Sequence, residues 1–81
     1  MAAHVTVLYF ASLRDAAGVA SEALEGVEGD LRGLYESLRS RHGFVLSVER
    51  LRVSVDGAFA CWDDAVTAES EIAFIPPVSG G

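Results

Sequence analysis

The segment VEGDLRGLYESLRSRH, residues 27–42, decides the fold, because its apolar side chains recur at the spacing of one helical face. The pattern i, i+4, i+7, i+8, i+11 is met by Val27, Leu31, Leu34, Tyr35 and Leu38. Gly29 and Gly33 each weaken a helix by about 1 kcal/mol relative to alanine, and Gly43 is a suitable stop. We therefore predict one amphipathic helix over about residues 27–42, stabilised mainly by packing of its apolar face.

Two strands are predicted before this helix. Residues 4–10, HVTVLYF, are β-branched and aromatic, which is typical of a strand. Residues 12–18 are polar and contain alanine, so we interpret them as a connection. Residues 19–24 then supply a second strand, which would form a hairpin with the first.

Three further strands are predicted after the helix. Residues 51–55 alternate apolar and polar side chains, as a half-buried strand does. Asp56-Gly57 is a strong signal for a tight hairpin turn, from which residues 58–62 return as the next strand. Residues 68–70 form a turn before the last strand, residues 71–75. Pro76-Pro77 closes that strand, because proline has no N–H to donate to a neighbour.

The resulting order of elements, β-β-α-β-β-β, indicates an α+β protein. It predicts a mixed sheet of about five strands with one main helix packed on one face. This is the β-grasp arrangement of ubiquitin-like proteins, although other α+β topologies share the same order. We assign residues 1–76 to the β-grasp domain and residues 77–81 to a flexible C-terminal tail.

Length and charge limit the possible functions. The 81 residues, 51% of them hydrophobic, suffice for one core but leave no internal cavity of substrate size. Function is therefore expected on the surface or at a chain end. The net charge of −6 makes nucleic acid a poor partner, and is compatible with a basic partner or with solubility alone. All six basic side chains are arginines, so no lysine amine can form a Schiff base or accept an acyl group.

The residues most often used in metal or thiol chemistry are few and isolated. The lone Cys61 excludes an internal disulfide and a cysteine-rich metal site. It has no adjacent base or helix N-terminus to activate it, so we interpret it as structural or incidental. His4 and His42 lack the spacing of metal ligands. Asp63-Asp64 is interpreted as a solvated turn, and Trp62 as part of the core because it shares the parity of Ala60.

The first ten residues, MAAHVTVLYF, contain neither the basic region of a signal peptide nor an apolar segment long enough to span a membrane. We therefore expect a cytoplasmic protein without a membrane partner.

One helix can cover only one face of the sheet, so strand alternation predicts which apolar side chains stay outside. The side chains assigned to the covered face are Val5, Val7, Ile72 and Phe74. The same alternation directs four others to the open face: Leu8, Phe10, Phe59 and Ile75. An exposed apolar patch usually marks a protein partner. The alternative is that a loop, such as residues 44–49, covers it.

The last residues, Pro76-Pro77-Val78-Ser79-Gly80-Gly81, suit insertion into a narrow channel. The prolines stiffen the exit from the sheet, and the five residues beyond Pro76 could reach roughly 17 Å at ~3.3–3.6 Å per residue. Two glycines let the backbone enter where a Cβ would not fit. The reactive group at such an end is the α-carboxylate of Gly81. The alternative is that Gly-Gly is an inert, frayed end.

A carboxylate is a poor electrophile, so another protein would have to activate Gly81, most simply as an acyl-adenylate made from ATP. A sulfur donor could then displace AMP and leave a thiocarboxylate. This chemistry needs no catalytic side chain in the carrier itself.

Two stretches carry a resemblance to a known family. Tyr9-Phe10-Ala11, followed by Leu13-Arg14-Asp15 and Gly18, is similar to an N-terminal FFA…RE…G motif. Residues 71–81, EIAFIPPVSGG, are similar to a C-terminal EVAFFPPVSGG motif. The family is the small subunit of molybdopterin synthase, a ubiquitin-like sulfur carrier. The resemblance covers the whole chain in length and element order and is most specific over residues 71–81. Ile75 replaces the usual second aromatic, and Val55-Asp56-Gly57 stands where the family often has Val-Asn.

The resemblance implies a β-grasp fold and a role in sulfur transfer. Gly81 would be adenylated by an E1-like activating enzyme and converted to a thiocarboxylate by a sulfur donor protein. The tail would then insert into the active site of the large synthase subunit and give its sulfur to precursor Z, a cyclic pyranopterin monophosphate, to form the molybdopterin dithiolene. The inserted residues would be Pro77, Val78, Ser79 and Gly80. By motif position, the partner interface would comprise Phe10, Arg14, Phe59 and Ile75.

The resemblance also implies a non-catalytic subunit of a heterotetrameric sulfurtransferase complex, with no permanent cofactor and no metal. Two other functions stay open. One is a sulfur carrier for thiamine, cysteine or tRNA thiolation, whose tail would also end in Gly-Gly, although the preceding Pro-Pro-Val-Ser favours the molybdopterin branch. The other is a ubiquitin-like interaction module with an inert terminus.

Overall fold

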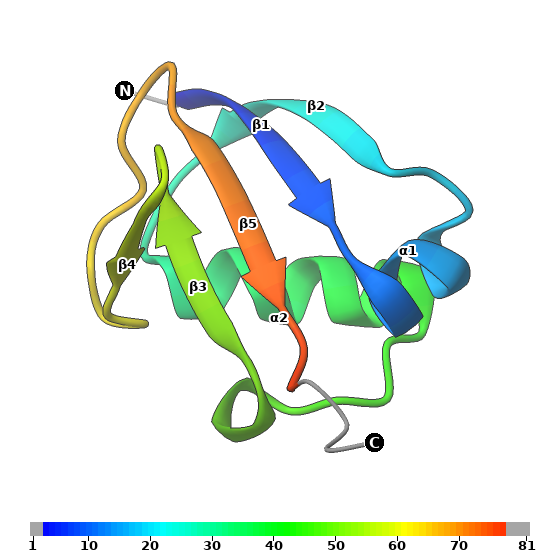
Figure 1. The fold of residues 1–81 in the computed structure, drawn as a ribbon. Coiled ribbons are helices and arrows are strands. Elements are labelled where there is room, and N and C mark those ends of the chain that lie inside the picture. Colours follow the sequence, from blue (N-terminus) through cyan, green and yellow to red (C-terminus); the bar gives the residue numbers. More distant parts are fainter. Residues whose placement is uncertain (1–2, 78–81) are drawn as a thin grey trace.

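The computed structural model describes residues 3–77 and confirms the predicted fold class, a five-stranded mixed sheet that carries one long helix on a single face (Figure 1). In chain order the elements are β1 (Ala3–Tyr9), α1 (Ala11–Ala17), β2 (Ser21–Val27), α2 (Leu31–His42), the 3-10 helix η1 (Val48–Arg50), β3 (Arg52–Val55), β4 (Ala58–Ala60) and β5 (Glu71–Ile75). The strand order across the sheet is β2-β1-β5-β3-β4. Strand β5 lies parallel to β1 and antiparallel to β3, so the first and last strands of the chain are neighbours.

Helix α2 begins at Leu31, and the prediction that it begins near Val27 is wrong. Val27 instead ends β2, where it pairs with Ala3 and still packs against the core. Gly29 then takes a φ of +92°, which reverses the chain. Asp30 caps the helix, because its Oδ1 accepts a hydrogen bond from the Gly33 N–H at 2.8 Å. The helical spacing of apolar residues therefore includes Val27, which belongs to the end of β2 and not to the helix.

Residues 12–18 belong largely to helix α1, although the sequence predicted only a connection there. Leu13 is the one buried side chain of this short helix, so the sequence contains no apolar periodicity from which the helix could be predicted. Gly18 ends the helix in the left-handed conformation, with φ +79°, and its N–H donates to the carbonyl of Arg14 at 2.9 Å. That glycine is the local signal from which the helix could have been predicted.

The strand positions agree with the sequence prediction except at their ends. Strand β2 runs from Ser21 to Val27 rather than over residues 19–24, and its pairing with β1 is irregular near Gly26, where φ is +73°. The Asp56-Gly57 hairpin is confirmed: both residues have positive φ, 51° and 87°, as a two-residue type I′ turn requires. Strand β4 stops at Ala60, because the Cys61 N–H donates to Asp64 in the following turn.

The core lies between the sheet and α2. The four side chains assigned to the covered face are at most 1% exposed: Val5, Val7, Ile72 and Phe74. Tyr35 of α2 lies at the centre, with its ring 5.1 Å from that of Phe74 in an edge-to-face contact. Trp62 stacks on Phe74 at 5.9 Å, lies 5.8 Å from the Tyr35 ring and is partly buried, which confirms that it packs against the core.

A polar cluster closes one end of this core, where β1, β2 and the end of α2 meet. Glu22 accepts a hydrogen bond from the Tyr9 hydroxyl at 2.7 Å, lies 3.1 Å from His42 Nε2 and forms an ion pair with Arg41 at 3.2 Å. Partial burial raises the pKa of Glu22, but the hydrogen bonds from Tyr9 and His42 and the charge of Arg41 outweigh it, so the pKa lies below its ordinary value. Burial, and then Glu22 itself, raise the pKa of Tyr9.

We expect this cluster to make folding stability sensitive to acid. Because the pKa of Glu22 is lower in the folded chain than in the unfolded one, its contribution is present above the ordinary glutamate pKa of about 4.3 and is lost as the pH falls through the folded value. Glu22→Gln should therefore destabilise the domain by ~1–2 kcal/mol at neutral pH. Thermal unfolding from neutral pH downwards should show this difference shrinking below about pH 4.3. A difference independent of pH would contradict the assignment. Glu25→Gln is the control, since Glu25 is exposed on the same strand.

Candidate functional site

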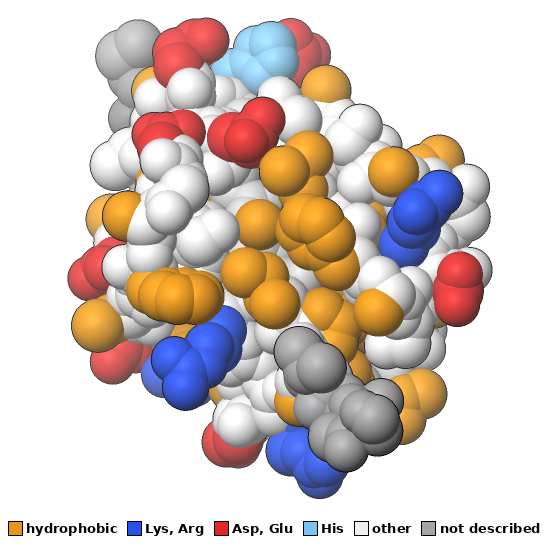
Figure 2. Space-filling view, in the orientation of Figure 1, with side chains coloured by type: hydrophobic (Ala, Val, Ile, Leu, Met, Phe, Trp, Pro, Cys, Tyr) orange, Lys and Arg blue, Asp and Glu red, His pale blue; other side chains and the backbone are white. Residues whose placement is uncertain are grey.

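The face of the sheet opposite α2 is open and apolar. Figure 2 shows apolar side chains gathered over β1 and β5, with basic and acidic side chains around the margins of this area. Phe10 and Phe59 are 45% and 69% exposed, while Leu8 and Ile75 are half-buried. Strand alternation therefore predicted the outward direction of these four side chains correctly, and two of them are large and well exposed. We call Leu8, Phe10, Phe59 and Ile75 the open-face patch.

Two shallow depressions meet where β5 leaves the sheet. One, of about 620 Å³, is lined mainly by apolar residues: Phe10, Ala11, Ser12, Leu46, Ile75, Pro76 and Pro77. The other, of about 340 Å³, is lined by Glu49, Arg50, Leu51, Arg52, Phe59, Ile75, Pro76 and Pro77. The exit segment Ile75–Pro77 is common to both. The structure thus brings Phe10 and Phe59 to the two sides of the point where the tail begins.

The loop after α2 does not cover the open-face patch, so that alternative is wrong. Phe44 is 4% exposed and lies in the core, whereas Val45 is 87% exposed and covers nothing. The Tyr35 hydroxyl donates to the carbonyl of Leu46 at 2.6 Å and holds the loop in place. Of residues 44–49, Leu46 borders the larger depression and Glu49 the smaller one, and both depressions stay open. Sequence alternation did not find Leu46 because it lies in a loop without periodicity.

Arg52 borders one of the two depressions on the open face, whereas Arg14 borders neither. Arg14 is exposed on α1 and lines a separate hollow with Asp15, Gly18, Val19 and Ala20. Its placement depends on α1, the helix that the sequence did not reveal. The Arg52 guanidinium lies over the Phe59 ring, 5.5 Å from the centroid, in cation–π geometry. Arg52 was not among the predicted site residues.

Of the predicted tail residues, only Pro77 is among those that the structure describes, and it is exposed. Val78, Ser79, Gly80 and the proposed reactive residue Gly81 lie outside the described residues.

The remaining acidic, cysteine and histidine candidates line neither depression of the open face. Asp63 forms an exposed ion pair with Arg32 at 3.1 Å, and Asp64 stabilises the turn that begins at Cys61, which confirms a solvated turn. Cys61 itself is an exposed free thiol. His42 belongs to the polar cluster with Glu22, while His4 is exposed on β1. Within residues 3–77, no group of three or more His, Cys, Asp or Glu side chains is arranged to hold a metal ion.

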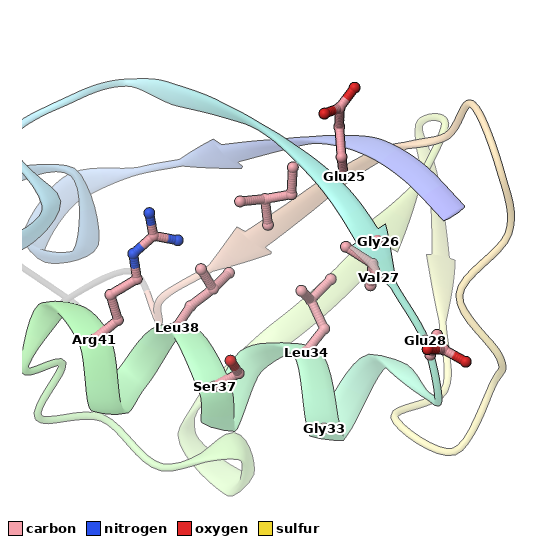
Figure 3. Close-up of a pocket in the computed structure, with 10 residues that line it drawn as sticks. Glu25, Gly26, Val27, Glu28, Gly33, Leu34, Ser37, Leu38 and Arg41 are labelled. Atoms are coloured by element: carbon pink, nitrogen blue, oxygen red, sulfur yellow. The ribbon is translucent and has the colours of Figure 1, made fainter. Parts of the chain in front are cut away.

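A further groove lies on the helix side of the sheet, between β2 and α2. Figure 3 shows Leu34 and Leu38 of α2 pointing towards β2, with Arg41 at one end and Glu28 at the other. At about 280 Å³ it is smaller than either depression on the open face, and neither the exit segment nor a patch residue lines it. The open face at the start of the tail is therefore the candidate functional site.

Neither helix in the described part of the chain has the length and apolar character needed to cross a bilayer.

Comparison with known proteins gives a consistent picture. The model of the ThiS family matches residues 7–81. A proposed molybdopterin converting factor, subunit 1, from Pyrococcus furiosus has 29% identity and a TM-score of 0.76, over 94% of this chain and 99% of that one. The small archaeal modifier protein 1 of Haloferax volcanii has 26% identity and a TM-score of 0.77 over the same shares. That of Methanosarcina acetivorans, at 23% identity and a TM-score of 0.78 over 100% of this chain and 99% of its own, shows the shared fold alone. A search of curated proteins gave no match.

Proposed function

The chain belongs to the ThiS family, which has the ubiquitin-like sulfur-carrier fold, and from this premise we propose that it is the sulfur-carrier subunit of a molybdopterin synthase. The observation that supports the proposal best is that the start of the tail lies beside the open-face patch. The exit segment Ile75–Pro77, which leads into Val-Ser-Gly-Gly, lies within the depressions that contain Phe10 and Phe59. A partner that covers the open face would therefore fix the position where the tail begins. Five extended residues reach roughly 17 Å, so Gly81 could enter an active site of that partner within this distance.

The proposed chemistry takes place at the Gly81 carboxylate. Its oxygen attacks the α-phosphate of ATP on an E1-like activating enzyme, and pyrophosphate leaves. A persulfide sulfur on a donor protein then attacks the acyl carbon, and AMP leaves with its electron pair to give an acyl disulfide. A second thiolate attacks the donor's own sulfur, which releases the thiocarboxylate and leaves the donor and that thiol joined as a disulfide. On the large subunit, the thiocarboxylate sulfur displaces an oxygen substituent of precursor Z to form a thioester. Water then cleaves the thioester at its acyl carbon, so that the sulfur stays on the pterin and Gly81 returns to a carboxylate. In this scheme the carrier positions its C-terminal carboxylate and extends it into the active sites of the other proteins. ATP is bound by the activating enzyme alone. The reactions take place in the cytoplasm.

A reconstituted assay tests this function. The chain would be combined with the activating enzyme, sulfur donor and large synthase subunit of its own organism, together with ATP and precursor Z. Molybdopterin should form, and omitting the chain should abolish it. Formation of a thiocarboxylate without molybdopterin would instead assign the chain to another sulfur-transfer pathway.

That other pathway is the second candidate, because the matching family model is ThiS rather than one specific to molybdopterin. Thiamine, cysteine and tRNA thiolation all use the same activated terminus. Co-purification separates them: recovery of a large molybdopterin synthase subunit supports the first candidate, and its absence supports the second.

Gly80→Val tests the narrow channel. We expect it to slow adenylation and sulfur transfer by roughly a hundredfold, because a β-branched side chain restricts φ and displaces the reacting carbon. Binding to the large subunit should change by less than about threefold, since the substitution leaves the exposed aromatic side chains Phe10 and Phe59 of the open-face patch unchanged. A time course of adenylation and sulfur transfer would give the rates, and calorimetry would give the affinity for the large subunit. Val78→Ile is the matched control. Transfer at the wild-type rate would contradict a channel shaped for glycine.

A further inference from the structure

The six arginines fall into two groups according to their partners. Three form ion pairs with carboxylates: Arg32 with Asp63 at 3.1 Å, Arg39 with Glu36 at 3.4 Å and Arg41 with Glu22 at 3.2 Å. The other three are exposed, and within residues 3–77 no side-chain carboxylate lies within 4.0 Å of them: Arg14, Arg50 and Arg52. This division is notable because the chain has twelve acidic side chains for its six arginines.

Two of the three arginines without a carboxylate lie next to the open-face patch, whereas Arg14 lines a separate hollow. Arg50 and Arg52 line the same depression as Phe59 and the exit segment Ile75–Pro77. Glu49 also borders this depression but pairs with neither. Figure 2 shows basic side chains at the margins of the apolar area. The charge around the exit therefore has the opposite sign to the net charge of −6.

Both side chains are exposed, and neither guanidinium forms an ion pair with a carboxylate of residues 3–77. Arg50 is the last residue of η1, where its N–H donates to the carbonyl of Ser47 at 2.9 Å, so its backbone is fixed while its side chain is exposed. The Arg52 guanidinium lies over the Phe59 ring, which orients it, and no carboxylate of the described residues forms an ion pair with it. A guanidinium fork matches the two oxygens of a carboxylate.

We propose that Arg50 and Arg52 determine specificity for the partner protein of the open face by pairing with acidic side chains that surround its apolar contact. The identity of that partner rests on the proposed function; Arg14 is already assigned to the interface by the family motif. The partner surface is thus an apolar pocket edged by Asp or Glu carboxylates. Charges at such a rim act mainly on association rate, salt dependence and choice of partner.

The test compares Arg50→Gln/Arg52→Gln with wild type and with Arg32→Gln. Arg32 is an exposed arginine that already has a partner, so its loss controls for the change in net charge. Calorimetry with the large synthase subunit would be run at about 50 mM and about 500 mM NaCl, which changes charge screening several-fold. The double variant should bind roughly tenfold more weakly at low salt and lose most of its salt dependence. Arg32→Gln should bind as wild type does, and thermal unfolding should be unchanged in both variants.

The possible failures are distinguishable. If wild type binds the large subunit but the double variant binds equally well at both salt concentrations, the arginine proposal is overturned and the proposed function stands. If wild type does not bind, the proposed function is overturned, together with the partner on which the arginine proposal rests.

Discussion

Deletion of Gly81 should abolish sulfur transfer and leave the fold unchanged. The proposed reacting atom is the acyl carbon at the end of the tail, so a tail one residue shorter withdraws it by about 3.5 Å from both active sites. Displacing a reacting atom by such a distance slows the chemical step a hundredfold or more. Stability should not change, because the core ends with Phe74, which is fully buried, and Pro77 is already exposed.

The measurement is molybdopterin formation in the reconstituted assay, with thermal unfolding of each variant. A variant with one alanine added after Gly81 is the matched case, since it keeps every native residue but moves the carboxylate. Both variants should be inactive and both should unfold at the wild-type temperature. Molybdopterin formation by the truncated chain would show that the terminus does not carry the sulfur.

Phe59→Asp should weaken the complex with the large subunit at least tenfold, whereas Phe74→Asp should unfold the domain. Phe59 is 69% exposed, so its loss costs the isolated domain little, while burial of one such side chain in an interface contributes roughly 1.5–3 kcal/mol. A factor of ten in affinity is about 1.4 kcal/mol. Phe74 is 0% exposed and contacts both Tyr35 and Trp62, so a charge there removes about 3–5 kcal/mol of packing and adds an unpaired buried carboxylate.

Two controls make this comparison specific. Phe59→Ala removes the ring without placing a new carboxylate near Arg52, and it should weaken binding in the same direction. Melting temperatures of the isolated variants separate surface from core. A drop for Phe59→Asp comparable to that for Phe74→Asp would contradict the outward position of Phe59, and with it the patch as the docking surface.

Strand alternation was the most informative part of the sequence. The inward direction of Val5, Val7, Ile72 and Phe74 follows from residue parity alone, because a pleated strand leaves each side chain only two directions. The Asp56-Gly57 turn was equally predictable, since few other residue pairs adopt two consecutive positive φ angles.

Other features depend on contacts that sequence patterns do not record. Helix α1 buries only Leu13, so it has no periodicity to detect. The start of α2 was placed too early because Val27 faces the same core from the end of β2, and a hydrophobic pattern does not distinguish the two backbones.

The candidate site was predictable only in part, for the same reason. Phe10, Phe59 and Ile75 could be placed by parity, and Arg14 by motif, but the approach of Leu46 to the patch depends on the Tyr35 hydrogen bond to its carbonyl. The division of the arginines into paired and unpaired groups depends on which carboxylates the fold brings near them. No spacing in the sequence contains that information.

The central claim is that Gly81 carries sulfur as a thiocarboxylate, and mass spectrometry tests it most directly. The chain would be co-expressed with its activating enzyme and sulfur donor and digested with a protease that cleaves after glutamate, because no arginine follows Arg52 and cleavage at Glu69 and Glu71 separates Cys61 from Gly81. The mass of its C-terminal peptide would then be compared with that from chain expressed alone. We expect this peptide to gain the mass difference between one sulfur and one oxygen atom, and the peptide containing Cys61 to be unchanged. An unmodified C-terminal peptide, or sulfur found only on Cys61, would contradict the central claim.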